Sequence, residues 1–255
     1  MSDIREQISR KLAEIERQEC VRILYAVESG SRAWGFASPD SDYDVRFIYV
    51  RPLEDYLRID DLRDVIEWQM DDVFDINGWD LKKTLRQFAK GNATLFEWSN
   101  SPVVYKTTDM WNEIYRVAKE FFSEKSAIGH YYGTANKTYM EYLTDEFVSY
   151  KKYFYALRPL LAANYIENHH TIPPVLFEKL LEENLSGDLR CAINDLLEKK
   201  KNTKESDLNP QIPVIKEFIS AEAIRQKEIV SQMPDDRNHN RARLDECFLH
   251  VLKCT

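Results

Sequence analysis

The hydrophobic pattern of the chain changes near residue 108, and this change limits the fold more than any other feature. Before it, short apolar runs with strand-like alternation are interleaved with helical segments. From about residue 109 onward, every long segment carries helical periodicity. A chain of 255 residues can hold two modest domains. We therefore expect a mixed αβ domain in residues 1–107 and a helical domain in residues 108–255.

Local patterns predict the order of elements in the first domain. Ile4, Ile8, Leu12 and Ile15 recur at helical spacing and predict an opening amphipathic helix. Four segments are expected to be strands: CVRILYAV (20–27), YDVRFIYV (43–50), DLRDVIEWQ (61–69) and DDVFDING (71–78). Two helices are expected to follow, LKKTLRQFAKG (81–91), capped by Asp80, and the short TLFEWSNSP (94–102).

The second domain is expected to be entirely helical. Its predicted helices cover residues 109–124, 126–143, 145–168, 174–184, 211–231 and 240–251. The polar segment LEKKKNTKESDLNP, residues 197–210, is expected to be an exposed loop.

Composition excludes several classes of protein. With 44% hydrophobic and 12% aromatic residues, the chain is expected to fold rather than to be disordered. A net charge of −8 disfavours broad coating of a nucleic-acid backbone, although a local basic groove remains compatible with it. The four cysteines form no C-x-x-C pair, so we expect reduced thiols and no structural zinc. Without a secretory signal or an apolar stretch of membrane-spanning length, a cytoplasmic protein with no membrane partner is expected.

Two aspartates lie at the start of the second expected strand. Residues two apart in a strand point to the same face, so Asp42 and Asp44 would present their carboxylates side by side. Hard oxygen donors placed in this way suit Mg²⁺, which takes one or two carboxylates together with substrate phosphates and water. A D-x-D pair alone is weak support, because a solvated turn explains it equally well.

Two further features strengthen the prediction of a metal and phosphate site. Gly30-Ser31 follows a buried strand, where glycine lets the backbone approach a ligand closely. A third carboxylate, Asp75, is flanked by apolar residues on a later strand. Together these groups can form a two-metal site for phosphoryl transfer. Asp80 is the alternative third carboxylate, but its expected role as a helix cap favours Asp75.

These residues carry a resemblance to a known superfamily. The string GSRAWGFASPDSDYDVRFIYV, with DINGWDLKKTLR and LFEWSNSPVVY, resembles the DNA polymerase beta nucleotidyltransferases. It is most similar to their RNA-repair-associated subfamily, known as RlaP. These motifs span residues 25–105, and KKYFYALRPLLAANYI extends the similarity to about residue 185.

The resemblance implies a fold, a reaction and a set of roles. The expected fold class is α+β, a small mixed β-sheet nucleotidyltransferase core with helices packed on it, followed by a helical C-terminal domain. The expected reaction transfers a nucleoside monophosphate from an NTP to an acceptor hydroxyl, with Mg²⁺ as the cofactor and Mn²⁺ as the alternative ion. Gly30 and Ser31 would contact the triphosphate, Asp42 and Asp44 would bind metal, and Asp75 would be the third ligand and the base near the acceptor.

Three further residues are predicted to contact the nucleotide. Arg46 lies on the same strand face as Asp44 and could clamp a phosphate, although an ion pair with the aspartates is an equal alternative. Ser41, directly before the D-x-D, is predicted to contact the substrate. Arg158 lies beside Pro159 in a helical run rich in lysine and tyrosine, where a proline kink could create a local binding feature. A tyrosine-rich core with lysines at its edge explains the same pattern.

Three functions remain open from the sequence. The first is the Mg²⁺-dependent nucleotidyltransferase, with the helical domain choosing an acceptor that could be RNA, a protein or a small molecule. The second is a nucleotide-binding regulatory or antitoxin-like module without turnover. A glycosyltransferase with a D-x-D metal site ranks last, because it explains neither Gly30-Ser31 nor Asp75.

Overall fold

The computed structural model describes residues 2–38, 41–71, 73–183, 185–201 and 207–254. The chain divides into two compact units. Unit 1 comprises residues 1–122 and 237–255, and unit 2 comprises residues 123–236. The expected boundary at residues 107 and 108 falls inside unit 1.

Unit 1 contains one five-stranded sheet and its flanking helices. The strands are β1 (Arg22–Glu28), β2 (Tyr43–Val50), β3 (Val65–Met70), β4 (Phe74–Asp80) and β5 (Val104–Lys106). The helices are α1 (Ser2–Gln18), α2 (Gly30–Trp34), α3 (Leu53–Tyr56), α4 (Leu81–Phe88), α5 (Ala93–Ser99), α6 (Asp109–Ala118), the 3-10 helix η1 (Lys119–Phe121) and α12 (Ala242–Cys254).

The sheet is mixed, with the strand order β3-β4-β2-β1-β5. β2 and β4 pair in parallel, whereas the other neighbouring strands pair antiparallel. The parallel register places Asp44 opposite Asp75. The predicted fold class is confirmed.

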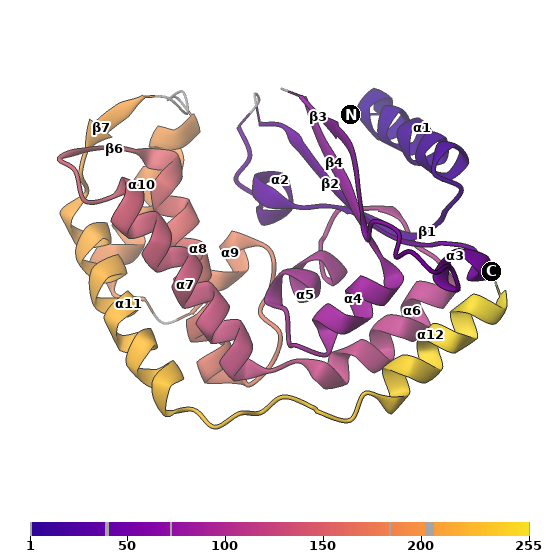
Figure 1. The fold of residues 1–255 in the computed structure, drawn as a ribbon. Helices are drawn as coiled ribbons and strands as arrows, with labels where there is room; N and C mark the ends of the chain where they lie inside the picture. Colours follow the sequence, from indigo (N-terminus) through magenta and orange to yellow (C-terminus); the bar gives the residue numbers. More distant parts are fainter. Residues whose placement is uncertain (1, 39–40, 72, 184, 202–206, 255) are drawn as a thin grey trace. The chain divides into compact units, whose positions relative to one another are not determined.

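Alternation along the central strands separates the apolar core from the polar site. Val45, Phe47 and Tyr49 of β2 join Ile76 of β4 in a buried cluster with α1. Figure 1 shows α1 covering this face of the sheet, with α4, α5 and α6 on the other side. The intervening residues of β2 and β4 therefore point away from the α1 cluster, and these include Asp44 and Asp75.

The helix α12 belongs to unit 1 although it follows unit 2 in the sequence. It packs against α4 and α6, and Phe248 of α12 contacts Tyr56 edge-on with ring centroids 5.2 Å apart. α6 itself packs on the sheet, where Trp111 stacks on Tyr25 at 4.7 Å. These contacts explain why both helices fall in the same unit as the strands.

Unit 2 is predominantly helical. Its elements are α7 (Glu124–Tyr142), β6 (Phe147–Ser149), α8 (Tyr150–His169), α9 (Phe177–Leu180), α10 (Gly187–Lys201), β7 (Leu208–Pro210) and α11 (Pro213–Gln232). α8 is the central helix, because most of its residues are buried and it packs against α7, α9, α10 and α11.

Unit 2 differs from the prediction in four places, and one of them is α10, a helix that was not among the predicted ones. β6 and β7 form a small antiparallel sheet where only helices were expected. The predicted helix at 174–184 shrinks to the four residues of α9. The expected loop at 197–210 was too long, since α10 continues to Lys201 and β7 begins at Leu208. Residues 202–206 of that segment lie outside the described residues.

Within the described residues, no helix combines the length and the apolarity that crossing a membrane would require.

Candidate functional site

The turn between β1 and α2 packs directly against Asp44. The Ser29 amide donates to the Asp44 carbonyl at 2.8 Å. Gly30 has φ +60°, and a Cβ atom placed on it would lie 2.0 Å from Oδ2 of Asp44. Any larger residue at position 30 would therefore have to displace the carboxylate. Ser31, the second residue of α2, is 4% exposed.

Arg46 joins the two aspartates that the parallel strands bring into register. Its Nη2 donates to Oδ1 of Asp44 at 2.9 Å and to Oδ2 of Asp75 at 2.6 Å. Its Nη1 donates to the Asp75 carbonyl at 2.7 Å. The side chain of Arg46 is only 13% exposed, so water screens these ion pairs weakly. The ion-pair alternative for Arg46 is thus observed, and its contact with a nucleotide stays a prediction.

The loop before β2 is held by Arg32. Its Nε donates to the Asp42 carbonyl at 3.0 Å and its Nη2 to the Ser41 carbonyl at 2.6 Å, while the guanidinium lies 3.8 Å from the ring centre of Tyr43. Ser41 is buried, and its hydroxyl accepts from the Ser38 amide at 3.1 Å. Asp42 directly precedes β2 and is half-buried. The hydroxyl of Ser41 therefore has a role within the loop, and its predicted substrate contact remains a prediction.

Glu28, a residue that the sequence reading missed, anchors Asp44 from the other side. It ends β1 at 1% exposure, and its Oε1 accepts from the Asp44 amide at 2.8 Å. Its Oε2 accepts from the Tyr105 hydroxyl. Burial raises the pKa of Glu28 to about 7, against the opposing effect of these hydrogen bonds. The signal in the sequence was a carboxylate closing an apolar strand directly before the Ser-Gly-Ser turn.

The two candidates for the third carboxylate have different surroundings. Asp75 pairs with Asp44 through Arg46, and its Oδ1 accepts from Nδ2 of Asn77 at 3.2 Å. Asp80 caps α4 by accepting from the Lys82 amide at 2.8 Å, and it accepts from the Tyr56 hydroxyl at 2.6 Å. Burial raises the pKa of Asp80. The predicted cap at Asp80 is confirmed, and the geometry places Asp75, not Asp80, beside Asp44.

Arg158 belongs to unit 2, within α8. It is 3% exposed, and its Nε donates to the Val175 carbonyl at 3.4 Å. The neighbouring lysines partly cover tyrosine rings, with Lys152 lying 3.7 Å from the ring centre of Tyr142. The cluster around Asp44 is assembled by unit 1 alone, and a nucleotide contact by Arg158 remains a prediction.

The donor set around β2 suits a hard divalent cation in part. Among the described residues, no three acidic, histidine or cysteine side chains gather closely enough to hold a metal ion. Mg²⁺ does not require three protein ligands, since substrate phosphates and water complete its coordination. Carboxylates at Asp42 and Asp44 provide the oxygen donors that it prefers, and Arg46 supplies positive charge to the Asp44 and Asp75 pair.

Comparison with known proteins identifies a family that matches nearly the whole chain. The sequence model of RlaP, the RNA repair pathway DNA polymerase beta family, matches residues 4–250. A Bacillus subtilis (strain 168) protein, uncharacterized protein YcgL, is 41% identical over 252 residues, which cover 98% of this chain and 97% of the relative. Such membership points to a nucleotidyltransferase-like function. The Gly30-Ser31 turn packs on Asp44, and the parallel pairing of β2 and β4 places Asp44 opposite Asp75. The chain belongs to the RlaP family of polymerase beta-like proteins.

Proposed function

We propose that this protein is a Mg²⁺-dependent nucleotidyltransferase that transfers a nucleoside monophosphate from an NTP to an acceptor hydroxyl, with an RNA end as the leading acceptor. The observation that carries the proposal is the register of β2 and β4, which sets Asp44 beside Asp75 with Gly30 packed against the Asp44 carboxylate. Membership of the RlaP family supports the reaction class and the RNA acceptor.

In the proposed reaction, the acceptor oxygen forms a bond to the α-phosphorus of the NTP. The bond from that phosphorus to the bridging oxygen breaks, and pyrophosphate leaves with the electron pair. Bound Mg²⁺, held by Asp42 and Asp44, would neutralise phosphate charge and polarise the reacting oxygens. Glycine at position 30 lets the turn lie directly against the Asp44 carboxylate, and Gly30 and Ser31 would contact the triphosphate beside it.

Asp75 is the proposed acceptor of the proton from the attacking hydroxyl. Its Oδ2 accepts from Arg46 at 2.6 Å, whereas its Oδ1 accepts, among the described residues, only the 3.2 Å bond from Asn77. Oδ1 is therefore the oxygen that we assign to proton transfer. Arg46 holds this carboxylate in place and fixes the direction of Oδ1.

The decisive experiment measures label transfer from each α-labelled NTP in Mg²⁺ or Mn²⁺ to a panel of RNA, protein and small-molecule acceptors. The Asp42→Asn, Asp44→Asn double variant should abolish transfer and metal-dependent NTP binding, while Lys90→Ala, an exposed change on the same unit, should alter neither. Label on RNA alone would assign the acceptor class. NTP binding without transfer to any acceptor would contradict the enzyme and favour the regulatory module.

A further inference from the structure

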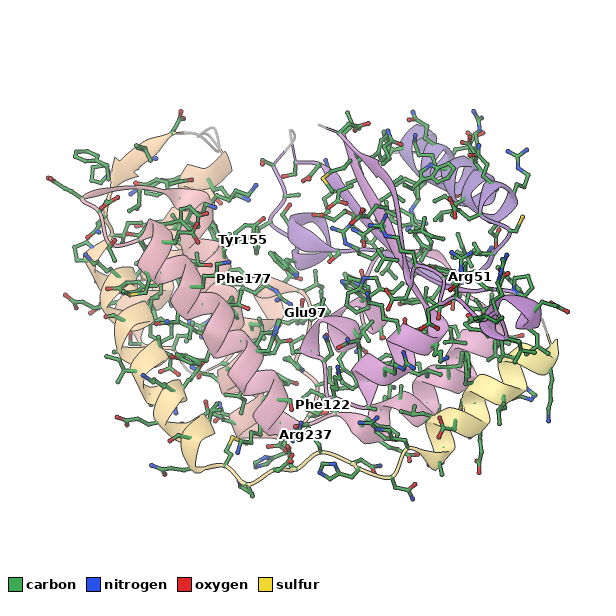
Figure 2. The ribbon with its side chains drawn as sticks, in the orientation of Figure 1. Arg51, Glu97, Phe122, Tyr155, Phe177 and Arg237 are labelled. Carbon is green, nitrogen blue, oxygen red and sulfur yellow. The ribbon has the colours of Figure 1, made fainter. Side chains whose placement is uncertain are left out.

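A polar cavity lies at the opposite end of the β2–β4 pair from the aspartates. It has a volume of about 270 Å³, and of the residues considered for the predicted site only Asp80, the alternative third carboxylate, lines it. Its walls come from the end of β2, α3, the segment before β3 and the start of α4. Arg51, labelled in Figure 2, directly follows β2 beside α3. Arg51 lies seven residues after Asp44 in the sequence, a separation of about 23 Å along an extended strand.

Hydrogen-bond donors exceed their partners in this cavity. Nε of Arg51 is buried and has no hydrogen-bond acceptor among the described residues. Lys82 and Arg86, one turn apart on α4, form no ion pair with any described residue. A buried donor without an acceptor is costly, and the neighbouring cations Lys82 and Arg86, without ion pairs among the described residues, favour an anionic ligand.

The carboxylates that line the same cavity form no ion pair with Lys82 or Arg86 in the described part of the chain. Asp80 balances part of the charge of Arg51, and its two oxygens accept hydrogen bonds from Tyr56 and from the Lys82 amide. Asp64 pairs with Lys83 at 3.0 Å, and Asp55 pairs with Arg58. Asp61 is exposed to solvent, and the remaining cation, Arg63, pairs with Glu67. Because Asp80 also caps α4, the attraction for an anion comes from side chains and not from the helix end.

A second cavity of about 190 Å³ adjoins the first, since Lys82 and Arg86 line both. Its other walls are largely apolar, with Leu85 and Ala89 from α4 and Leu244 and Phe248 from α12, joined by Arg241 and Asp245. Each cavity is smaller than the roughly 300 Å³ at which pockets for drug-sized ligands begin, whereas the two together exceed it. One ligand with an anionic part and an apolar part would use both.

We propose that these adjoining cavities form a second binding site of unit 1, for a phosphate-bearing small molecule with an aromatic body, the chemical class of the mononucleotides. Arg51, Lys82 and Arg86 bind the phosphate group, and Phe248 and Leu244 contact the aromatic ring. This site is independent of the proposed transfer reaction, because it shares no residue with the cluster around Asp44.

The test is isothermal titration calorimetry of the full chain in buffer with a chelator and no divalent cation. The ligands are the four nucleoside monophosphates, adenosine, pyrophosphate and inorganic phosphate. We expect saturable binding of at least one monophosphate, weaker binding of pyrophosphate or phosphate, and none of adenosine. The melting temperature should rise with the ligand that binds, because binding to the native state stabilises it.

Variants assign the binding to these cavities. Lys82→Ala with Arg86→Ala should weaken monophosphate binding at least about tenfold, because charge-assisted hydrogen bonds are lost. Phe248→Ala should weaken monophosphate binding but not that of pyrophosphate. Lys90→Ala is the matched control, since it removes an exposed cation just after α4 that lines neither cavity. Arg86→Gln alone, at an exposed position, serves if the double variant fails to fold.

The site is also separable from the proposed catalytic cluster. The Asp42→Asn, Asp44→Asn variant should retain metal-free monophosphate binding even though it loses transfer. Failure of every ligand to bind would overturn the proposal, as would equal binding of adenosine. Binding that the changes at Lys82 and Arg86 leave intact would assign the ligand to another place and overturn it too.

Discussion

The parallel pair of β2 and β4 has charged side chains at both ends, but they are ion-paired at one end and partly without ion pairs among the described residues at the other. At the start of the strands, one arginine satisfies two aspartates and lies largely out of the solvent. At the far end, Lys82 and Arg86 have no ion pairs among the described residues, and Nε of Arg51 has no acceptor. A closed network fixes the geometry of its own members, whereas an open one leaves its charges for a ligand. The strands thus carry a fixed carboxylate site and an open basic site about 23 Å apart.

The largest expected effect is on the rate of nucleotidyl transfer, and it distinguishes Asp75, at the ion-paired end of the strands, from Asp80, at the end that carries the cavity. Asp75→Asn should slow nucleotidyl transfer about 10²- to 10⁴-fold, as removal of a general base does. Asp80→Ala should leave transfer near the wild-type rate and lower the free energy of unfolding by about 1 kcal/mol, because it removes the cap of α4. Single-turnover label transfer and urea unfolding measure the two quantities. The reverse outcome would make Asp80 the third carboxylate.

Titration of Glu28 tests how strongly the closed end is buried. Folding raises the pKa of this carboxyl from 4.5 to about 7, so the native state binds the proton more tightly than the unfolded state. The stabilising contribution of Glu28 is therefore fully present below pH 4.5 and is lost as the pH rises to about 7, a change of about 3 kcal/mol.

Glu28→Gln removes this titration and supplies the reference. The difference in free energy of unfolding between wild type and variant should shift against the wild type by about 3 kcal/mol between pH 4.5 and pH 7. Urea unfolding in metal-free buffer across this range measures it. A difference that stays constant with pH would mean that Glu28 is far better solvated than its 1% exposure indicates.

Two glycine substitutions sharpen the comparison between a packed position and an open one. Gly30→Ala should cost about 1–2 kcal/mol from its φ of +60° alone, and more because the new Cβ meets the Asp44 carboxylate. Gly133→Ala is the matched control, since nothing lies within 4 Å of its Cβ position inside α7, and it should stabilise by about 0.5–1 kcal/mol. Thermal unfolding of both variants measures this. Equal tolerance would show that the turn can move away from Asp44.

The smallest effect is expected at the open end. Arg86→Ala removes an exposed side chain without an ion pair among the described residues, so the free energy of unfolding without ligand should change by less than about 0.5 kcal/mol. A decrease in the free energy of unfolding well above this value would mean that Arg86 stabilises α4. The two ends of the strands would then no longer differ in this respect.

Local signals predicted much of the fold, whereas contacts between distant segments escaped them. Alternation in YDVRFIYV and the cap at Asp80 depend on neighbouring residues, and both are present. The parallel register of Asp44 with Asp75 cannot be derived from periodicity, because it depends on which strands become neighbours. Glu28 was missed for the same reason, since its partners Asp44 and Tyr105 lie 16 and 77 residues away.

The return of α12 to unit 1 has a consequence for how the protein is made. The ribosome releases the whole of unit 2, residues 123–236, before α12 can reach α4 and α6. Until then, the nascent sheet must exist without the helix that carries Phe248 and Leu244, and the apolar sides of α4 and α6 stay open to chaperones. A chain that ends at residue 236 should therefore keep every residue of the aspartate cluster, but its unit 1 should be less stable than its unit 2.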